Sequence, residues 1–242
     1  MKSSLSQPVR LKPGESVDAF LDGSLRLIQS TKGYRFSIDA VLLSGFVTTR
    51  PGDFVVDLGA GCGIVALMLL VSRKIGHVLC LEIQAGLADQ AGRNAALNGF
   101  EQKMSVIIGD MRAPPLSASM ADVVVCNPPF RPARSGRINP EPEKAIARHE
   151  ILVSLNDILR AASRILKLKG RLTMVYPAER LADLMVRMRS YDLEPKRMQV
   201  LFPSAEGEGK LVFMEAVRGG RGGLKILPPL MDQGDYSIST ST

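Results

Sequence analysis

Short apolar runs alternate with amphipathic stretches through the middle of the chain. Five runs have the length and composition of buried strands: residues 54–58, 77–82, 105–109, 122–126 and 171–176. Four stretches repeat apolar residues at helical spacing: residues 64–72, 85–98, 154–167 and 179–189. Strands that alternate with helices build a mostly parallel sheet covered by helices on both faces. The pattern therefore predicts an α/β fold.

The N-terminal part departs from this alternation. Residues 17–30 carry short alternating segments around Asp22-Gly23, which predict a small hairpin. Ser37 is placed to cap a helix that starts at Ile38. We expect three parts in the chain: an arm with a small hairpin over 1–32, one domain over 33–230 and a flexible tail over 231–242.

The C-terminal part predicts further strands. Residues 199–202 and 211–217 are apolar runs expected to form an antiparallel pair. The 154–167 stretch ends in basic residues and is followed by Gly170, a combination typical of a helix C-terminus. We therefore expect the helix to continue through Lys167.

Composition narrows the class of protein. The 242 residues carry a formal net charge of +7, which favours a polyanionic partner, nucleic acid first. The three cysteines lie far apart without CxxC spacing and only two histidines are present, so we expect no metal site. The longest apolar run is too short to cross a bilayer, and no signal peptide is visible. We expect a cytoplasmic protein, and the sequence leaves monomer and homodimer open.

A glycine-rich loop follows the first core strand and opens a helix. Glycines at this position allow a tight turn and close approach of the backbone to a ligand. The spacing departs from the dinucleotide fingerprint, because Ile64 stands at the last fingerprint position. Asp57 at the strand tip would repel a pyrophosphate but suits an ammonium group. S-adenosylmethionine carries an amino group and a sulfonium but no phosphate. The candidate cofactor residues here are Asp57, Gly59, Ala60, Gly61 and Gly63.

Two further acidic residues stand at the ends of the next two strands. Glu82, with Ile83 beside it, lies where an acidic residue typically accepts hydrogen bonds from ribose hydroxyls. Asp110 lies where a carboxylate can accept from an adenine amino group, and the backbone of Met111 is placed to contact the ring. Three acids at successive strand tips beside a glycine loop predict a nucleoside-bearing cofactor.

The fourth strand ends in Asn127-Pro128-Pro129-Phe130, which we expect to be the catalytic segment. A proline pair cannot continue a paired strand, so the chain must leave the sheet here. The strand end then displays an amide side chain, a carbonyl oxygen and an aromatic ring. Two acceptors beside a stacking ring suit a planar base that bears an NH2 group, and the cofactor candidates include Asn127 as well.

These segments together resemble class I S-adenosylmethionine-dependent methyltransferases, and Asn127–Phe130 resembles the [N/D/S]PP[Y/F/W] motif of members that methylate amines. Residues 22–29 and 33–43, with the tail around 224–229, are similar to the tRNA(Val) adenine-N6 methyltransferase family. The resemblance implies a Rossmann-like, mostly parallel seven-stranded sheet with helices on both faces and a C-terminal antiparallel pair. It also implies that the target is adenine next to the anticodon. Three residues would lie across the methionine end of the cofactor: Phe36, Ser37 and Asp39.

Residues 131–150 are basic and proline-rich, and we expect Arg131, Arg134 and Arg137 to contact RNA phosphates. Two other methyl acceptors stay open: guanine N2 in rRNA, and the side-chain nitrogen of a glutamine in a translation release factor. A non-catalytic RNA-binding module on the same scaffold is the alternative of another class. Asp57 and the glycine spacing disfavour a nicotinamide oxidoreductase.

Overall fold

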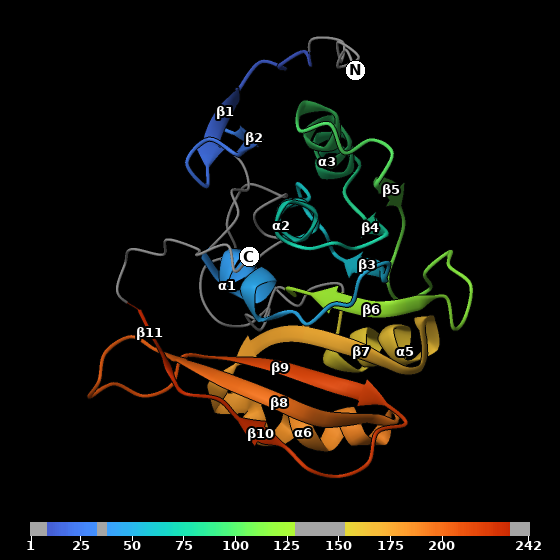
Figure 1. Ribbon diagram of the computed structural model, residues 1–242, viewed down its shortest axis with the longest axis vertical. Helices are drawn as coiled ribbons and strands as arrows, with labels where there is room; N and C mark the ends of the chain where they lie inside the picture. Colours follow the sequence, from blue (N-terminus) through green and yellow to red (C-terminus); the bar gives the residue numbers. More distant parts are fainter. Residues whose placement is uncertain (1–8, 33–37, 129–152, 233–242) are drawn as a thin grey trace.

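The computed structural model describes residues 9–32, 38–128 and 153–232, and a mixed β-sheet runs through its centre (Figure 1). The strands lie in the order β10-β8-β9-β7-β6-β3-β4-β5, with β11 also paired to β8. The strands are β3 (Phe54–Leu58), β4 (His77–Glu82), β5 (Met104–Ile108), β6 (Ala121–Cys126), β7 (Leu166–Pro177), β8 (Leu193–Phe202), β9 (Leu211–Arg218), β10 (Lys225–Ile226) and β11 (Leu230–Met231).

The predicted seven-stranded sheet is confirmed, and two short strands extend it. Strands β3 to β7 pair in parallel, whereas β9 runs antiparallel between β7 and β8. The two-residue strands β10 and β11 pair with β8 in parallel. The predicted C-terminal antiparallel pair is therefore β8 and β9, with β8 starting six residues earlier than expected.

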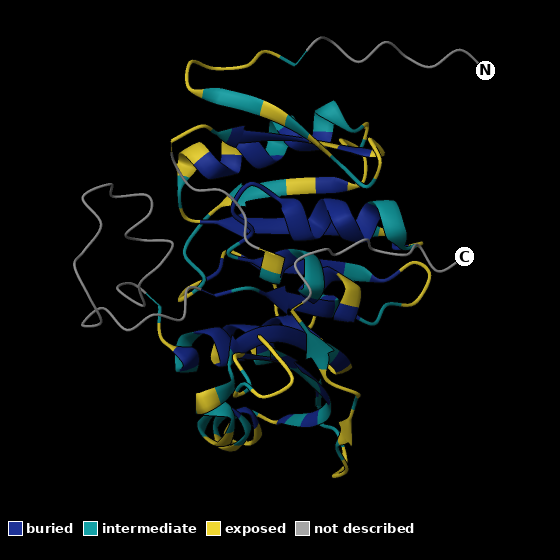
Figure 2. Cartoon of the chain, turned by 90° about the vertical axis from the view of Figure 1, so that its left-hand side faces the viewer, coloured by how far each residue is buried: buried dark blue, intermediate teal, exposed yellow. Residues whose placement is uncertain are grey.

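Helices cover both faces of the sheet, as the alternation predicts. On one face lie α1 (Ile38–Phe46), α2 (Ile64–Ser72) and α3 (Ala85–Leu97), and on the other lie α5 (Leu155–Ile165) and α6 (Leu181–Ser190) (Figure 1). Helix α2 is apolar around its whole circumference because the sheet lies on one side of it and α1 and β2 on others. Figure 2 shows buried residues gathered in α2 and the central strands. This packing fixes the glycine loop that precedes α2.

The N-terminal hairpin is confirmed and packs onto α3. Strands β1 (Glu15–Phe20) and β2 (Leu25–Ser30) pair antiparallel. Their turn places Leu21, Asp22 and Gly23 at positive φ, which the Asp-Gly pair favours. The inward side chains Leu25 and Leu27 are fully buried.

The end of the 154–167 stretch differs from the prediction. Helix α5 begins where the sequence predicts it, with a capping box between Ser154 and Asp157, but the helix ends at Ile165 and Lys167 already belongs to β7. Gly170 lies in the strand, where a Cβ would come within 2.9 Å of the Lys167 carbonyl oxygen and 3.2 Å of the Asp122 oxygen. Glycine is needed here for close backbone approach at a register shift against β6, so it resembles a helix stop without being one.

Candidate active site

The carboxyl ends of β3, β4, β5 and β6 meet at one edge of the sheet. Leu58 pairs with Leu81 on one side and with Cys126 on the other, and Glu82 pairs with Ile108. The chain passes from β3 outward to β5 and then returns to β6 on the other side of β3. Ligands of open α/β sheets bind at such a reversal of strand order. The glycine loop after β3 and Asn127 after β6 flank this point.

The glycine loop is a tight turn held by its neighbour strand. The N–H groups of Gly59 and Ala60 donate to the Leu81 carbonyl oxygen at 2.8 and 3.2 Å, and Gly63 N–H donates to the Ala60 oxygen at 2.9 Å. Gly59, Gly61 and Gly63 have φ values of 76°, 57° and 85°, a region that disfavours other residues. Three of the predicted cofactor residues thus have a conformation that requires glycine.

We expect Gly63→Ala to destabilise the fold by about 2–4 kcal/mol, because a Cβ at positive φ would also crowd the core. That Cβ would lie 2.6 Å from Met104 Cε and 3.2 Å from Ala91 Cβ. Gly92→Ala on α3 is the control, since nothing lies within 4 Å of its Cβ position. Urea denaturation should show the control unchanged or stabilised by less than about 1 kcal/mol. Equal stability of the two variants would contradict the packing argument.

The Glu82 side chain holds the glycine loop through a hydrogen bond to its backbone. The side chain is 5% exposed, Oε2 accepts from the Gly61 N–H at 2.8 Å, and Oε1 accepts from the Gln84 N–H at 2.9 Å. Burial raises the pKa of this carboxyl, and interactions with the backbone amides of Gln84, Gly61 and Ile83 act in the opposite direction. Each carboxylate oxygen keeps a second lone pair, so Glu82 can still accept from ligand hydroxyls.

Asp57 is a buried carboxyl with one oxygen that lacks a hydrogen-bond partner among the described residues. It is 2% exposed, and among the described residues no group donates to its Oδ2. Burial, and then the charge of Glu82, raise its pKa to about 7. A buried polar atom without a partner costs free energy unless a ligand completes it. A cationic donor would both pair with Oδ2 and favour the ionised form, so this site fits the amino group of S-adenosylmethionine.

The segment after β5 also reaches the loop. A Cβ on Gly59 would lie 3.0 Å from Met111 Cε, so the Met111 side chain lies against the loop backbone. The Asp110 carboxylate accepts from Arg112 Nε at 2.7 Å and from the Arg112 N–H at 2.8 Å. Arg112 lowers the pKa of Asp110, which is thus ionised at neutral pH. Contact of Asp110 with an adenine amino group stays a prediction, and Arg112 is a neighbour that sequence reasoning did not include.

Part of the predicted site is described and part lies outside the described residues. Asn127 is half-buried and Pro128 buried at the end of β6, and Ile83 is 40% exposed after β4. Asp39 is half-exposed in the first turn of α1. The other predicted residues lie outside the described ranges: Phe36, Ser37, Pro129, Phe130, Arg131, Arg134 and Arg137.

Sequence reasoning missed one residue that contacts the loop. Asn94 of α3 is fully buried, and its Nδ2 donates to the Cys62 carbonyl oxygen at 2.9 Å. Its signal in the sequence is an amide placed three residues after Ala91, on the apolar stripe of an amphipathic helix.

Two further expectations concern metal ions and membranes. Within the described ranges, no three His, Cys, Asp or Glu side chains are grouped closely enough to hold a metal ion. The cysteines in these ranges, Cys62, Cys80 and Cys126, are buried free thiols, and burial raises the pKa of each. None of the described helices has the length and apolar character needed to span a bilayer.

Comparison with known proteins shows which family the chain resembles. Residues 37–188 match the family model described as methyltransferase small domain. A Porphyromonas gingivalis protein named tRNA1(Val) (adenine(37)-N6)-methyltransferase is 30% identical over 189 residues, covering 75% of this chain and 73% of the relative. A protein of the same name from Aeromonas hydrophila is 28% identical over 182 residues, covering 75% of each chain.

Solved structures share the fold at low sequence identity. A predicted O-methyltransferase from Agrobacterium tumefaciens has a TM-score of 0.65 at 20% identity, covering 83% of this chain and 91% of that one. Geranyl diphosphate C-methyltransferase from Streptomyces coelicolor has a TM-score of 0.55 at 17% identity, covering 74% and 79%. Because the family model spans more than half of the chain, this protein belongs to the methyltransferase small-domain family.

Proposed function

We propose that this protein is an S-adenosylmethionine-dependent methyltransferase that methylates N6 of an adenine next to the anticodon of a tRNA. Membership of a methyltransferase family and the names of the relatives support the reaction and the substrate. The observation that carries the proposal is the buried Asp57 carboxyl, whose Oδ2 has no partner among the described residues, beside a glycine turn and next to the strand that ends at Asn127. Such an enzyme would work in the cytoplasm, where tRNA is processed.

Four parts of the edge would hold the cofactor. Asp57 would pair with its amino group, Glu82 would accept from its ribose hydroxyls, and Met111 would lie against its adenine. The glycine loop would let the backbone approach the ligand closely. When bound, S-adenosylmethionine supplies an electrophilic methyl group on a positively charged sulfur.

The strand end after β6 would prepare the nucleophile. The exocyclic nitrogen of adenine is a weak nucleophile because its lone pair is delocalised into the ring. If the Asn127 side-chain oxygen and the Pro128 carbonyl oxygen accept its two hydrogens, the nitrogen becomes pyramidal and its lone pair points outward. Orientation of this kind contributes as much as about 7–11 kcal/mol in favourable cases. The nitrogen becomes acidic once methylated, so its proton passes to solvent without a strong general base.

The methylated nucleoside tests the proposal and its alternatives. The protein is incubated with methyl-labelled S-adenosylmethionine and one substrate in each of three reactions: unmodified tRNA, rRNA or a release factor. The labelled product of each reaction is then identified. We expect N6-methyladenosine, and replacing the adenine next to the anticodon should abolish labelling of the tRNA. Label in N2-methylguanosine or in glutamine would replace this function by one of the alternatives. Absence of both cofactor binding and labelling would favour a non-catalytic RNA-binding module.

We expect Arg134→Glu combined with Arg137→Glu to weaken tRNA binding by at least tenfold. The slope of log affinity against log salt should fall by about 2, because two phosphate contacts are lost. The control is the double reversal of Lys74 and Lys103, exposed residues that precede β4 and β5 at the opposite edge of the sheet. Filter binding at several salt concentrations measures the tRNA affinity and its salt dependence for each variant. An equal loss in the control would show that net charge alone binds RNA.

A further inference from the structure

The N-terminal hairpin and the glycine loop are joined by one side chain. Asn94 Oδ1 accepts from the Ile28 N–H at 2.6 Å, and its Nδ2 donates to the Ile28 carbonyl oxygen at 3.1 Å. The same Nδ2 donates to the Cys62 carbonyl oxygen at 2.9 Å. An amide nitrogen has two hydrogens, and Asn94 uses both, one toward the hairpin and one toward the loop.

A second asparagine makes the same contact with the hairpin but not with the loop. Asn98 Oδ1 accepts from the Arg26 N–H at 2.9 Å, and its Nδ2 donates to the backbone carbonyl oxygens of Arg26 at 2.6 Å and of Asn94 at 2.8 Å. Positions four apart on a helix are separated by about 6 Å, close to the separation of positions two apart on a strand. The side-chain amides of Asn94 and Asn98 therefore hydrogen-bond to the backbone of β2 as a neighbouring strand would, along the edge of β2 that does not pair with β1.

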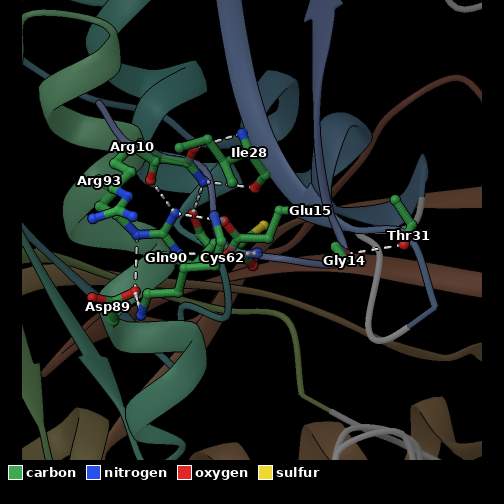
Figure 3. A network of polar contacts seen from close by, with 11 residues as sticks. Arg10, Gly14, Glu15, Ile28, Thr31, Cys62, Asp89, Gln90 and Arg93 are labelled. Carbon is green, nitrogen blue, oxygen red and sulfur yellow. Dashed lines mark hydrogen bonds and ion pairs between the residues drawn. The ribbon is translucent and has the colours of Figure 1, made fainter. Parts of the chain in front are cut away.

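Charged groups fix the other strand of the hairpin to the same helix. Arg93 donates to both oxygens of Glu15 at 2.5 and 2.7 Å and to Asp89 at 2.9 Å, and Lys12 donates to Asp89 at 2.7 Å. Figure 3 shows Arg93 and Glu15 in one polar network with Ile28 and Cys62. The Arg93 hydrogen bond lowers the pKa of Glu15, so this pair is ionised at neutral pH. Helix α3 is thus attached to both strands of the hairpin.

We infer that Asn94 is a positioning residue for the cofactor loop and that it couples docking of the hairpin to cofactor binding. This inference rests on the proposed function. Fixing the Cys62 carbonyl fixes the peptide that joins Cys62 to Gly63, and hence the turn between β3 and α2. The opposite side of that turn carries Gly61, whose N–H binds Glu82. Asn94 acts through the loop backbone and need not touch the reacting atoms.

Paired variants separate loop positioning from attachment of the hairpin. Asn94→Ala and Asn98→Ala both remove an amide that holds β2, but only the first frees the Cys62 carbonyl. Calorimetry with S-adenosylhomocysteine should show at least tenfold weaker binding for Asn94→Ala and less than threefold for Asn98→Ala. Hydrogen exchange of the amides of β2 should accelerate in both. Equal affinities of the two variants would overturn the positioning role.

Thermodynamic linkage allows the coupling between the hairpin and cofactor binding to be measured on the wild-type protein. This measurement tests the coupling even if Asn94→Ala does not fold. Coupling is reciprocal, so S-adenosylhomocysteine should slow exchange of the Ile28 amide in the wild type. A hairpin whose exchange is unchanged by bound ligand would overturn the coupling. Failure of the wild type to bind cofactor at all would instead overturn the proposed function. In that case exchange of the Gly61 to Gly63 amides without ligand still compares the two variants directly.

Discussion

Asp57→Asn should strongly weaken cofactor binding and at the same time make the protein more stable at pH 8. The carboxyl is 2% exposed, and Oδ2 has no partner among the described residues. An asparagine has the same shape but no charge, so it cannot pair with an ammonium group. We expect affinity for S-adenosylmethionine to fall by at least 100-fold, because removing one partner of a buried charge pair costs several kcal/mol.

The gain in stability follows from the raised pKa. The folded protein holds the Asp57 proton up to about pH 7, whereas the same carboxyl in the unfolded chain loses it near its ordinary pKa of 3.8. Between these values the folded state binds more protons, so wild-type stability falls as the pH rises from about 4 to about 7. Above pH 7 the penalty is complete, on the order of 4 kcal/mol at most. Asp57→Asn lacks this penalty, and its advantage should vanish toward pH 4.

Cofactor affinity should depend on the same ionisation of Asp57, but it should rise with pH where the stability of the protein falls. A cation binds the ionised carboxylate, so affinity of the wild type should fall about tenfold per pH unit below about 7 and level off above it. Calorimetry and urea denaturation from pH 5 to 8 measure the affinity and stability profiles. Asp183→Asn on α6, a partly exposed carboxylate paired with Arg187, should alter neither profile in this way. A pH-independent affinity in the wild type would contradict the role given to Asp57.

Strand and loop positions at the candidate site follow closely from the sequence. The bounds of β3, α2 and β4 agree with the predicted ranges 54–58, 64–72 and 77–82. Each of these elements is a short apolar run bounded by glycine or polar residues, and such a run has few alternatives once it must be buried. Because parallel strands end at the same edge, Asp57, Glu82 and Asn127 are brought together by topology alone.

Contacts that depend on tertiary packing did not follow from the sequence. The α5–β7 boundary was misplaced because Lys167 and Gly170 form a local helix-end signal, while pairing with β6 extends the strand back to Leu166. Tertiary pairing overrides such local signals. Asn94 was missed for a related reason, since only the folded chain shows which carbonyls lie beside a buried amide. Arg112 was missed because its contact with Asp110 depends on the turn after β5.

Asn127→Ala should reduce the rate of methyl transfer by at least 100-fold, or about 2.7 kcal/mol in the barrier, while cofactor affinity stays within a few-fold of the wild type. Asn127 lies directly after β6, whose residue Cys126 pairs with Leu58 just before the glycine loop. Alanine removes an acceptor for the amine but leaves Asp57, Glu82 and the loop in place. The loss should therefore appear in kcat measured with saturating tRNA and cofactor, and calorimetry should show near-normal binding.

Two conservative variants show whether the acceptor itself is responsible. Asn127→Asp keeps a side-chain oxygen in nearly the same position, and Asn127→Ser keeps a shorter one, so both should retain more activity than alanine. Stability of all three variants is compared by urea denaturation, which separates loss of function from loss of fold. If Asn127→Ala turned over like the wild type, or lost activity only in proportion to weaker cofactor binding, Asn127 would not orient the amine. A graded loss in the order Asp, Ser, Ala at constant cofactor affinity is what an acceptor at this strand end requires.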